Sequence, residues 1–188
     1  MLGVVAFERM KLSVLSIALG LGLAAPQIYG LMNPKGFAAA AKKFPRNVPV
    51  GIALMLLATV WFVWNVSQES DADFATMKPY LMVAFVGVGI GTCIFVQDFL
   101  AARGLAVVFL LLAKLMVDTA RWADTDWRVV ISGWAYVLVA GGIWFTISPW
   151  RVRDVLEWAT ATEQRIKLGC ALRLAFGLFV AALGLTVF

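Results

Sequence analysis

The chain has 188 residues, of which 62% are hydrophobic and 14% are charged. Soluble domains are closer to half apolar and carry about a quarter charged residues, so this composition and the mean hydropathy of +0.89 indicate an integral membrane protein. The net charge of +5 is no sign of nucleic-acid binding, because cationic residues in membrane proteins mostly set orientation. The absence of histidine excludes histidine-ligated haem or chlorophyll, most zinc and copper sites, and Ser-His or Cys-His nucleophile pairs.

Long apolar runs predict the fold class. A helix needs about 20 residues to cross a bilayer, and continuous apolarity without period-two alternation excludes a β-barrel. We therefore expect an all-α, polytopic transmembrane helical bundle, formed as one integral-membrane domain over residues 1–188, with about six spans and two short interfacial amphipathic helices. The expected spans are residues 12–32, residues 48–66, a segment from Pro79 to just before Gln97, and residues 105–120, 129–147 and 168–188.

The N-terminal apolar run allows two interpretations. A short lead carrying Glu8, Arg9 and Lys11 precedes an apolar run that reaches Leu23-Ala24-Ala25, as in a signal peptide. Pro26 would hinder cleavage after those alanines and the run continues, so a retained span is the favoured interpretation. Pro26 is also expected to kink this helix or to end its first half.

Two charged segments follow spans and have one apolar helical face each. Residues 33–47 carry only cations, with Phe37 and Phe44 on the apolar face, and residues 150–167 mix acids and bases. Both patterns predict helices lying on the membrane surface, and a lipid headgroup or partner site is the alternative for the basic one. The cations expected at the lipid interface are Lys42, Lys43, Arg46, Arg151 and Arg153.

The third span contains the strongest helix-packing signal. Gly87 and Gly91 are one helical turn apart and should let another helix approach closely. An acidic segment with Glu69, Asp71 and Asp73 precedes this span, and a tight turn is expected over residues 97–104. Trp61 and Trp64 near the end of the second span are interpreted as interfacial anchors.

Cationic residues predict the orientation of the chain. The first, third and fifth loops hold most of the lysines and arginines, whereas the second and fourth hold only Lys78, Arg121 and Arg128. The first set is expected to face the cytoplasm, which places both termini outside. Arg9 and Lys11 argue against this orientation.

The beginning and end of the chain resemble each other. Each has a span, a turn with Pro34 or Pro149, a charged segment, and a run that begins Gly51-x-Ala-Leu-x-Leu or Gly169-x-Ala-Leu-x-Leu. These features outline a parallel pseudo-repeat, residues 12–66 and 129–188, flanking a central hairpin of residues 79–121. Duplication and chance similarity of apolar helices both explain the match.

The C-terminal unit, residues 141–188, resembles the small two-span hairpin proteins of bacterial inner membranes. Those proteins pair a span ending near proline, an amphipathic link and a glycine-rich second span. The resemblance covers about a quarter of the chain. It implies a multi-pass protein of the bacterial inner (cytoplasmic) membrane and implies no chemistry.

Ionisable residues inside spans are the candidate functional residues, because burying them in lipid is costly. Lys114, Asp118 and Arg121 can share one helical face, either as a local ion pair or as an ion or substrate relay. Arg173 lies one turn inside the last span. It can reach the interface, grip a lipid phosphate or pair with Asp98.

No pair of carboxylates lies deep in a span, and Asp124 and Asp126 fall in an exposed loop, so the sequence does not predict an enzyme, a metal site or a cofactor. Cys93 and Cys170 predict no disulfide framework. The favoured function is a structural or accessory subunit that packs against other membrane proteins or itself. The alternative is a small oligomeric transporter or channel that uses Lys114, Asp118 and Arg173. The expected partners are the lipid bilayer and membrane proteins, without nucleic acid. Pigments or quinones between helices leave no motif.

Overall fold

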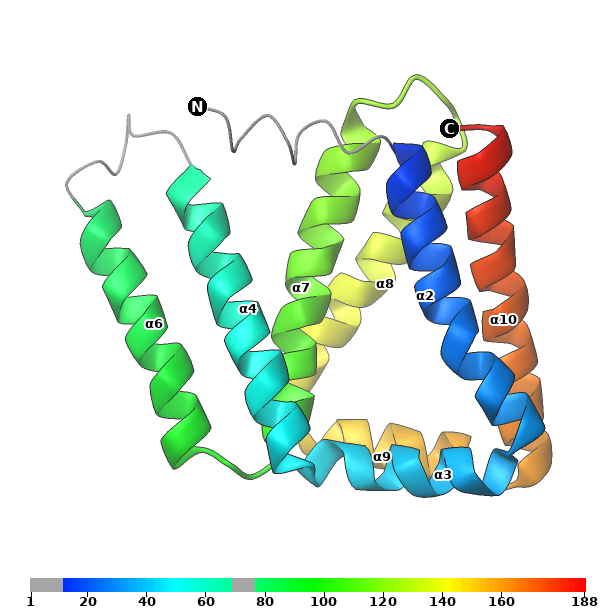
Figure 1. The fold of residues 1–188 in the computed structure, drawn as a ribbon, viewed down its shortest axis with the longest axis horizontal. Helices are drawn as coiled ribbons and strands as arrows, with labels where there is room; N and C mark the ends of the chain where they lie inside the picture. Colours follow the sequence, from blue (N-terminus) through cyan, green and yellow to red (C-terminus); the bar gives the residue numbers. More distant parts are fainter. Residues whose placement is uncertain (1–11, 69–76) are drawn as a thin grey trace. The chain divides into compact units, whose positions relative to one another are not determined.

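The computed structural model describes residues 12–68 and 77–188, and these residues form only helices and connecting turns. Six described helices are long and apolar enough to cross a membrane, which confirms the all-α class and the six expected spans (Figure 1). Positions discussed above that lie outside the described residues are Glu8, Arg9, Lys11, Glu69, Asp71 and Asp73.

Six long helices and two short ones make up the fold. The long helices are α2 (Leu12–Met32), α4 (Val48–Gln68), α6 (Lys78–Phe95), α7 (Leu100–Arg121), α8 (Arg128–Ile147) and α10 (Glu163–Thr186). The short helices are α3 (Pro34–Lys43), which continues into the 3-10 helix η1 (Phe44–Arg46), and α9 (Trp150–Ala159). The elements α2–α3–α4 and α8–α9–α10 thus share the order of the pseudo-repeat, whose origin by duplication stays a prediction.

Asparagine caps fix two helix starts. The Asn33 side chain accepts a hydrogen bond from the Gly36 backbone N–H at 2.9 Å, and Asn47 accepts one from Val50 at 3.3 Å. Each bond satisfies a backbone donor that the first turn of a helix leaves without an intrahelical partner. α3 and α4 therefore begin where the polar loop residues end.

Two predicted boundaries are wrong. The turn expected over residues 97–104 is helical from Leu100, because Leu100 and Ala101 are buried against α4 and favour the helix. The last span begins at Glu163 rather than at Leu168. Thr162 starts it by accepting a hydrogen bond from the Arg165 N–H at 3.3 Å, which assigns the end of the predicted amphipathic segment to α10.

Pro26 does not end the first span. α2 continues past Pro26 to Met32. Proline removes one backbone donor inside a helix, and a span tolerates this where neighbouring groups can compensate. The side-chain amide of Gln27 donates to the Leu23 carbonyl at 3.3 Å on this part of the helix.

The chain divides into two compact units that share the long helices α7 and α8. The described residues of the first unit are 12–43, 112–139 and 153–188. Those of the second unit are 44–68, 77–111 and 140–152. The single membrane domain expected from the sequence stays a prediction.

In the first unit, α2 and α10 run antiparallel side by side through small residues (Figure 1). A Cβ atom added to Gly177 would lie 2.7 Å from the Gly20 carbonyl oxygen, and one added to Gly184 would lie 2.8 Å from that of Ser13. The backbones of the two helices are therefore in direct contact. Small residues are what permit such close approach between membrane helices.

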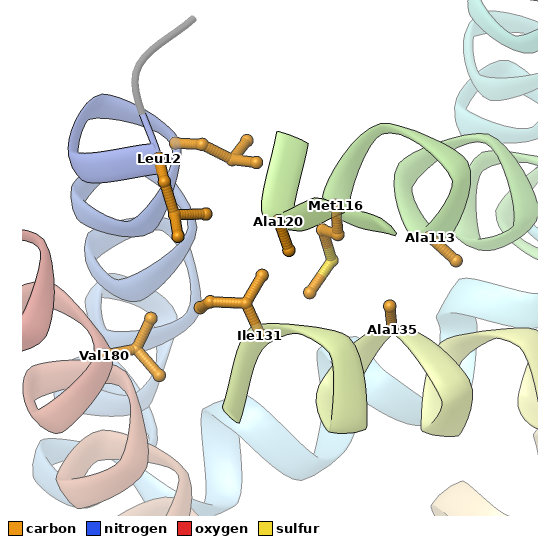
Figure 2. Close-up of a cluster of buried hydrophobic side chains, with 8 residues drawn as sticks. Leu12, Ala113, Met116, Ala120, Ile131, Ala135 and Val180 are labelled. Carbon is orange, nitrogen blue, oxygen red and sulfur yellow. The ribbon is translucent and has the colours of Figure 1, made fainter. Parts of the chain in front are cut away.

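Larger side chains complete the core of the first unit where α7 and α8 reach α2 and α10. Met116, Ile131 and Val180 are fully buried there (Figure 2). The other buried members of this cluster are Leu12, Leu15, Ala113, Ala120 and Ala135. Trp134 packs edge-on against Phe176, with ring centroids 5.2 Å apart, at the border of the cluster.

In the second unit, α6 packs against α4 through Gly89. The side chain of Thr59 occupies the space a Cβ at Gly89 would need, and the rings of Phe62 and Phe85 meet edge-on at 4.5 Å. Gly87 and Gly91, the glycines expected to pack, have nothing within 4 Å of an added Cβ. The sequence thus pointed to the correct helix, but the α6 glycine that contacts another helix of this chain is Gly89.

The close contact of α2 and α10 predicts that alanine substitution at two glycines of α2 changes the free energy of unfolding differently. Gly20→Ala places a methyl group against the Gly177 carbonyl and Ala181 backbone, and should lower the free energy of unfolding by about 1–3 kcal/mol. Gly22→Ala meets open space and should be neutral, or stabilising by up to about 1 kcal/mol through helix propensity. Unfolding titrations in mixed micelles measure both variants, and equal effects would contradict the packing.

Candidate functional site

Lys114 and Asp118 form an ion pair on α7. Their four-residue spacing puts both side chains on one face of the helix, where the Lys114 Nζ donates to Asp118 Oδ2 at 2.8 Å. The side chains are 48% and 53% exposed. The predicted local pairing is confirmed, and it leaves each charge neutralised at a half-exposed position.

Arg121 stands apart from this pair. It is exposed in the last turn of α7 and makes no ion pair with a described residue. A cation in the last turn of a helix interacts favourably with the backbone dipole. Its charge therefore favours this helix end, and a relay through Lys114, Asp118 and Arg121 stays a prediction.

The structure does not pair Asp98 or Arg173 with any described residue. Asp98 is exposed in the turn between α6 and α7. Arg173 is exposed on α10, one helical turn from Gly169, and its guanidinium lies along that helix. Of the options considered for Arg173, the exposed position agrees with a side chain that reaches outward from the span.

Lys42 and Lys43, at the end of α3, are exposed. No ion pair joins Lys42 or Lys43 to another residue in the described part of the chain. Lys35, in the first turn of the same helix, lies 3.7 Å from Glu163 at the start of α10. The charge of α3 is thus partly balanced at its beginning and unbalanced at its end.

α9 differs from α3 because it carries acidic as well as basic residues. Arg153 lies 2.9 Å from the Asp154 carboxylate and 3.8 Å from that of Glu157. Asp154 raises the pKa of the Arg153 guanidinium, first through their hydrogen bonds and then through its opposite charge. Arg151 is exposed on the same helix. The cations of α9 are therefore accompanied by acids on their own helix.

Arg46 contributes a contact that the sequence did not indicate. Its guanidinium lies 5.3 Å from the ring centroid of Phe99, a cation–π contact within the second unit. Phe99 is buried and has a φ of 55°, which a bulky residue rarely adopts. The contact joins η1 to the turn before α7, so the exposed Arg46 has a structural partner, and its place at the lipid interface stays a prediction.

Buried polar groups were missed by the sequence analysis. Ser16 and Gln27 of α2 are 0% and 6% exposed, and Ser16 Oγ and Gln27 Oε1 have no hydrogen-bond partner among the described residues. The buried Arg103 Nε likewise lacks one. A lone serine or glutamine in an apolar run is the only signal a sequence gives for such a group.

One open depression lies at the end of the first unit where α2 begins. Its volume is about 340 Å³, and Asp124 is the only ionisable side chain among the described residues that line it, which are Leu12, Ala123, Asp124, Thr125, Val187 and Phe188. Within the described residues, no group of three or more Cys, Asp or Glu side chains is placed to hold a metal ion. No protein-family model, curated protein or solved structure matches the chain.

The Lys114–Asp118 pair predicts a compensating double substitution. Lys114→Met and Asp118→Leu each leave one unpaired charge on a span, and each should lower the free energy of unfolding by about 1 kcal/mol at these half-exposed positions. The double variant removes both charges and should be more stable than either single variant. Unfolding titrations of the three variants and the parent protein test this. The pairing would be contradicted if the double variant lost as much unfolding free energy as the two single variants together.

Proposed function

We propose that the chain is a non-catalytic integral membrane protein that acts as a structural or accessory subunit, packing against other membrane proteins. The observation that carries this proposal is the open small-residue face of α6. Only Gly89 of this helix is buried. An outer helix with one occupied face fits a protein whose packing is completed by a partner.

Helix geometry makes the two faces of α6 distinct. Gly87 and Gly91 are four residues apart and share one face, whereas Gly89 is displaced from Gly87 by about 200° around the helix axis. Thr59 occupies the Gly89 face, and Gly87 and Gly91 meet nothing within 4 Å. The helix therefore carries a surface for close approach on each side, and this chain uses one of them.

Lipid alone does not account for the second surface. Bilayer chains pack well against large apolar side chains, and such residues cover most of α6, including Val83, Val88 and Ile94. Paired glycines instead favour a second helix, because they let backbones approach and gain dispersion contacts. A partner helix is thus the occupant that the composition of this face supports.

The transporter or channel is supported less well. That function needs Lys114 and Asp118 to face a polar path, yet they are paired at 2.8 Å on a half-exposed face of α7. Arg173 is exposed on α10. A membrane location follows from the six spans. The bacterial inner membrane rests on the resemblance of residues 141–188 to two-span hairpin proteins and is part of the proposal.

Bulky residues on the open face of α6 should disrupt assembly without unfolding the chain. Gly87→Leu/Gly91→Leu fills the space a partner helix would occupy, and a Cβ at either position has no described residue of another helix within 4 Å. After gentle solubilisation from the native membrane, the intact mass of this variant should fall from that of a larger assembly to that of the single chain.

Gly133→Leu on α8 is the matched control. A Cβ added at Gly133 also meets nothing within 4 Å, but the residues four positions away are Val129 and Val137, so Gly133 has no second glycine at the four-residue spacing. This variant should keep the parent mass. A parent protein that is already a monomer in the gentle extract would refute the proposal.

Ion flux separates the two functions. Reconstituted alone in liposomes, the chain is expected to leave cation and anion flux at the level of protein-free vesicles, because its exposed ionisable pair on α7 is self-neutralised. Fluorescent ion indicators inside the vesicles measure this. Flux that rises with the parent protein and disappears with Lys114→Met would establish the transporter or channel instead.

A further inference from the structure

We propose that the end of α3 binds anionic phospholipid headgroups through Lys42 and Lys43. This inference is independent of the proposed packing function, because it concerns the chain and its own bilayer. Its basis is a difference between α3 and α9 that the structure shows.

The position of α3 between two spans places it at the membrane surface. α3 follows directly on the span α2 and precedes the span α4, so it lies at the end of the membrane-crossing segments. Phe37 belongs to its apolar face and packs on α2: a Cβ added to Gly30 would lie 3.2 Å from the Phe37 ring. With this face turned to the spans, the helix has the orientation of an interfacial amphipathic helix.

Contacts with other helices hold the beginning of α3 in place. Besides the Phe37 contact, Lys35 lies 3.7 Å from Glu163 at the start of α10. The helix start is capped by Asn33. These contacts engage the beginning of α3 and the side opposite its polar face. They leave Lys42 and Lys43, at the other end, free to face the headgroup layer.

The charge of α3 differs from that of α9. α3 contains no acid, and neither Lys42 nor Lys43 has an ion pair within the described residues. α9 has the same length, but its Arg153 is bound by Asp154 and faces Glu157. Two adjacent ammonium groups at the surface attract anionic lipid phosphates, and an internally balanced helix does not. The structure therefore assigns the lipid site to α3 rather than to α9.

Lysines in the last turn of a helix also stabilise its carboxyl end. That role needs positive charge near the final carbonyl groups, and it leaves the ammonium groups exposed to a ligand. Charge-retaining variants do not separate the two roles, but lipid affinity does, because helix-end stabilisation alone predicts no preference for anionic over zwitterionic lipid. The experiment therefore measures lipid binding and helix content together.

Native mass spectrometry of the purified full chain measures the dissociation constant of the first bound phosphatidylglycerol, with phosphatidylcholine as the zwitterionic reference. Lys42→Gln/Lys43→Gln should weaken phosphatidylglycerol binding by about fivefold for each lysine removed and leave phosphatidylcholine binding unchanged. Lys42→Arg/Lys43→Arg keeps the charge and should keep the affinity. Circular dichroism checks that helix content is equal in all variants.

Arg121→Gln/Arg128→Gln is the control for net charge. It removes the same number of charges from the α7–α8 connection, which also holds Asp124 and Asp126, and should change the affinity for phosphatidylglycerol by less than about twofold. The proposal is overturned if the α3 glutamine variant binds phosphatidylglycerol as the parent does. It is also overturned if the control variant loses as much affinity, since net charge alone would then explain the binding.

Discussion

The direct backbone contact between α2 and α10 is the interaction on which the first unit depends. Water is absent from the bilayer core, so burying apolar side chains between helices gains little over leaving them in lipid. Stability must then come from dense packing. Gly20, Gly177 and Gly184 supply it, because only residues without a side chain let the helix backbones meet at these distances.

This contact also explains why the polar residues of α2 remain tolerable. Ser16 and Gln27 are buried on the helix pair, and Gln27 keeps one hydrogen bond to its own helix through the Leu23 carbonyl. Such a bond reduces the cost of burying an amide in an apolar region. Pro26, directly before it, weakens the local backbone ladder without ending the helix.

The spans could be predicted from the sequence because each depends on local properties. Apolar length identified all six, and the polar residue Asn33 before Pro34 marked the start of α3. The errors occurred where a distant contact decided the outcome. Leu100 and Ala101 are helical because α4 buries them, and the start of α10 depends on a cap at Thr162 inside a segment whose charge pattern looked interfacial.

The glycines at helix contacts show the same limit of prediction from sequence. The spacing of Gly87 and Gly91 predicts a surface for close approach, but spacing does not say which helix comes to it, and no described residue lies within 4 Å of a Cβ added at either position. Gly89, two residues from each, meets Thr59, and the glycines of the α2–α10 contact are spread over two distant segments. A pair of glycines on one helix is visible in sequence. A contact that needs one glycine from each of two helices becomes visible only when both are placed.

The apolar bilayer core that requires close packing through glycines also determines where the ionisable side chains lie. Charge is costly in lipid, so a chain packed through small apolar residues keeps its charges at helix ends or neutralises them locally. Lys114 and Asp118 do the second on α7, and Arg153 with Asp154 does it on α9. Lys42 and Lys43 lie at a helix end, and no described acidic residue neutralises them. Anionic headgroups at the bilayer surface are the counter-charge that we propose for this end of α3.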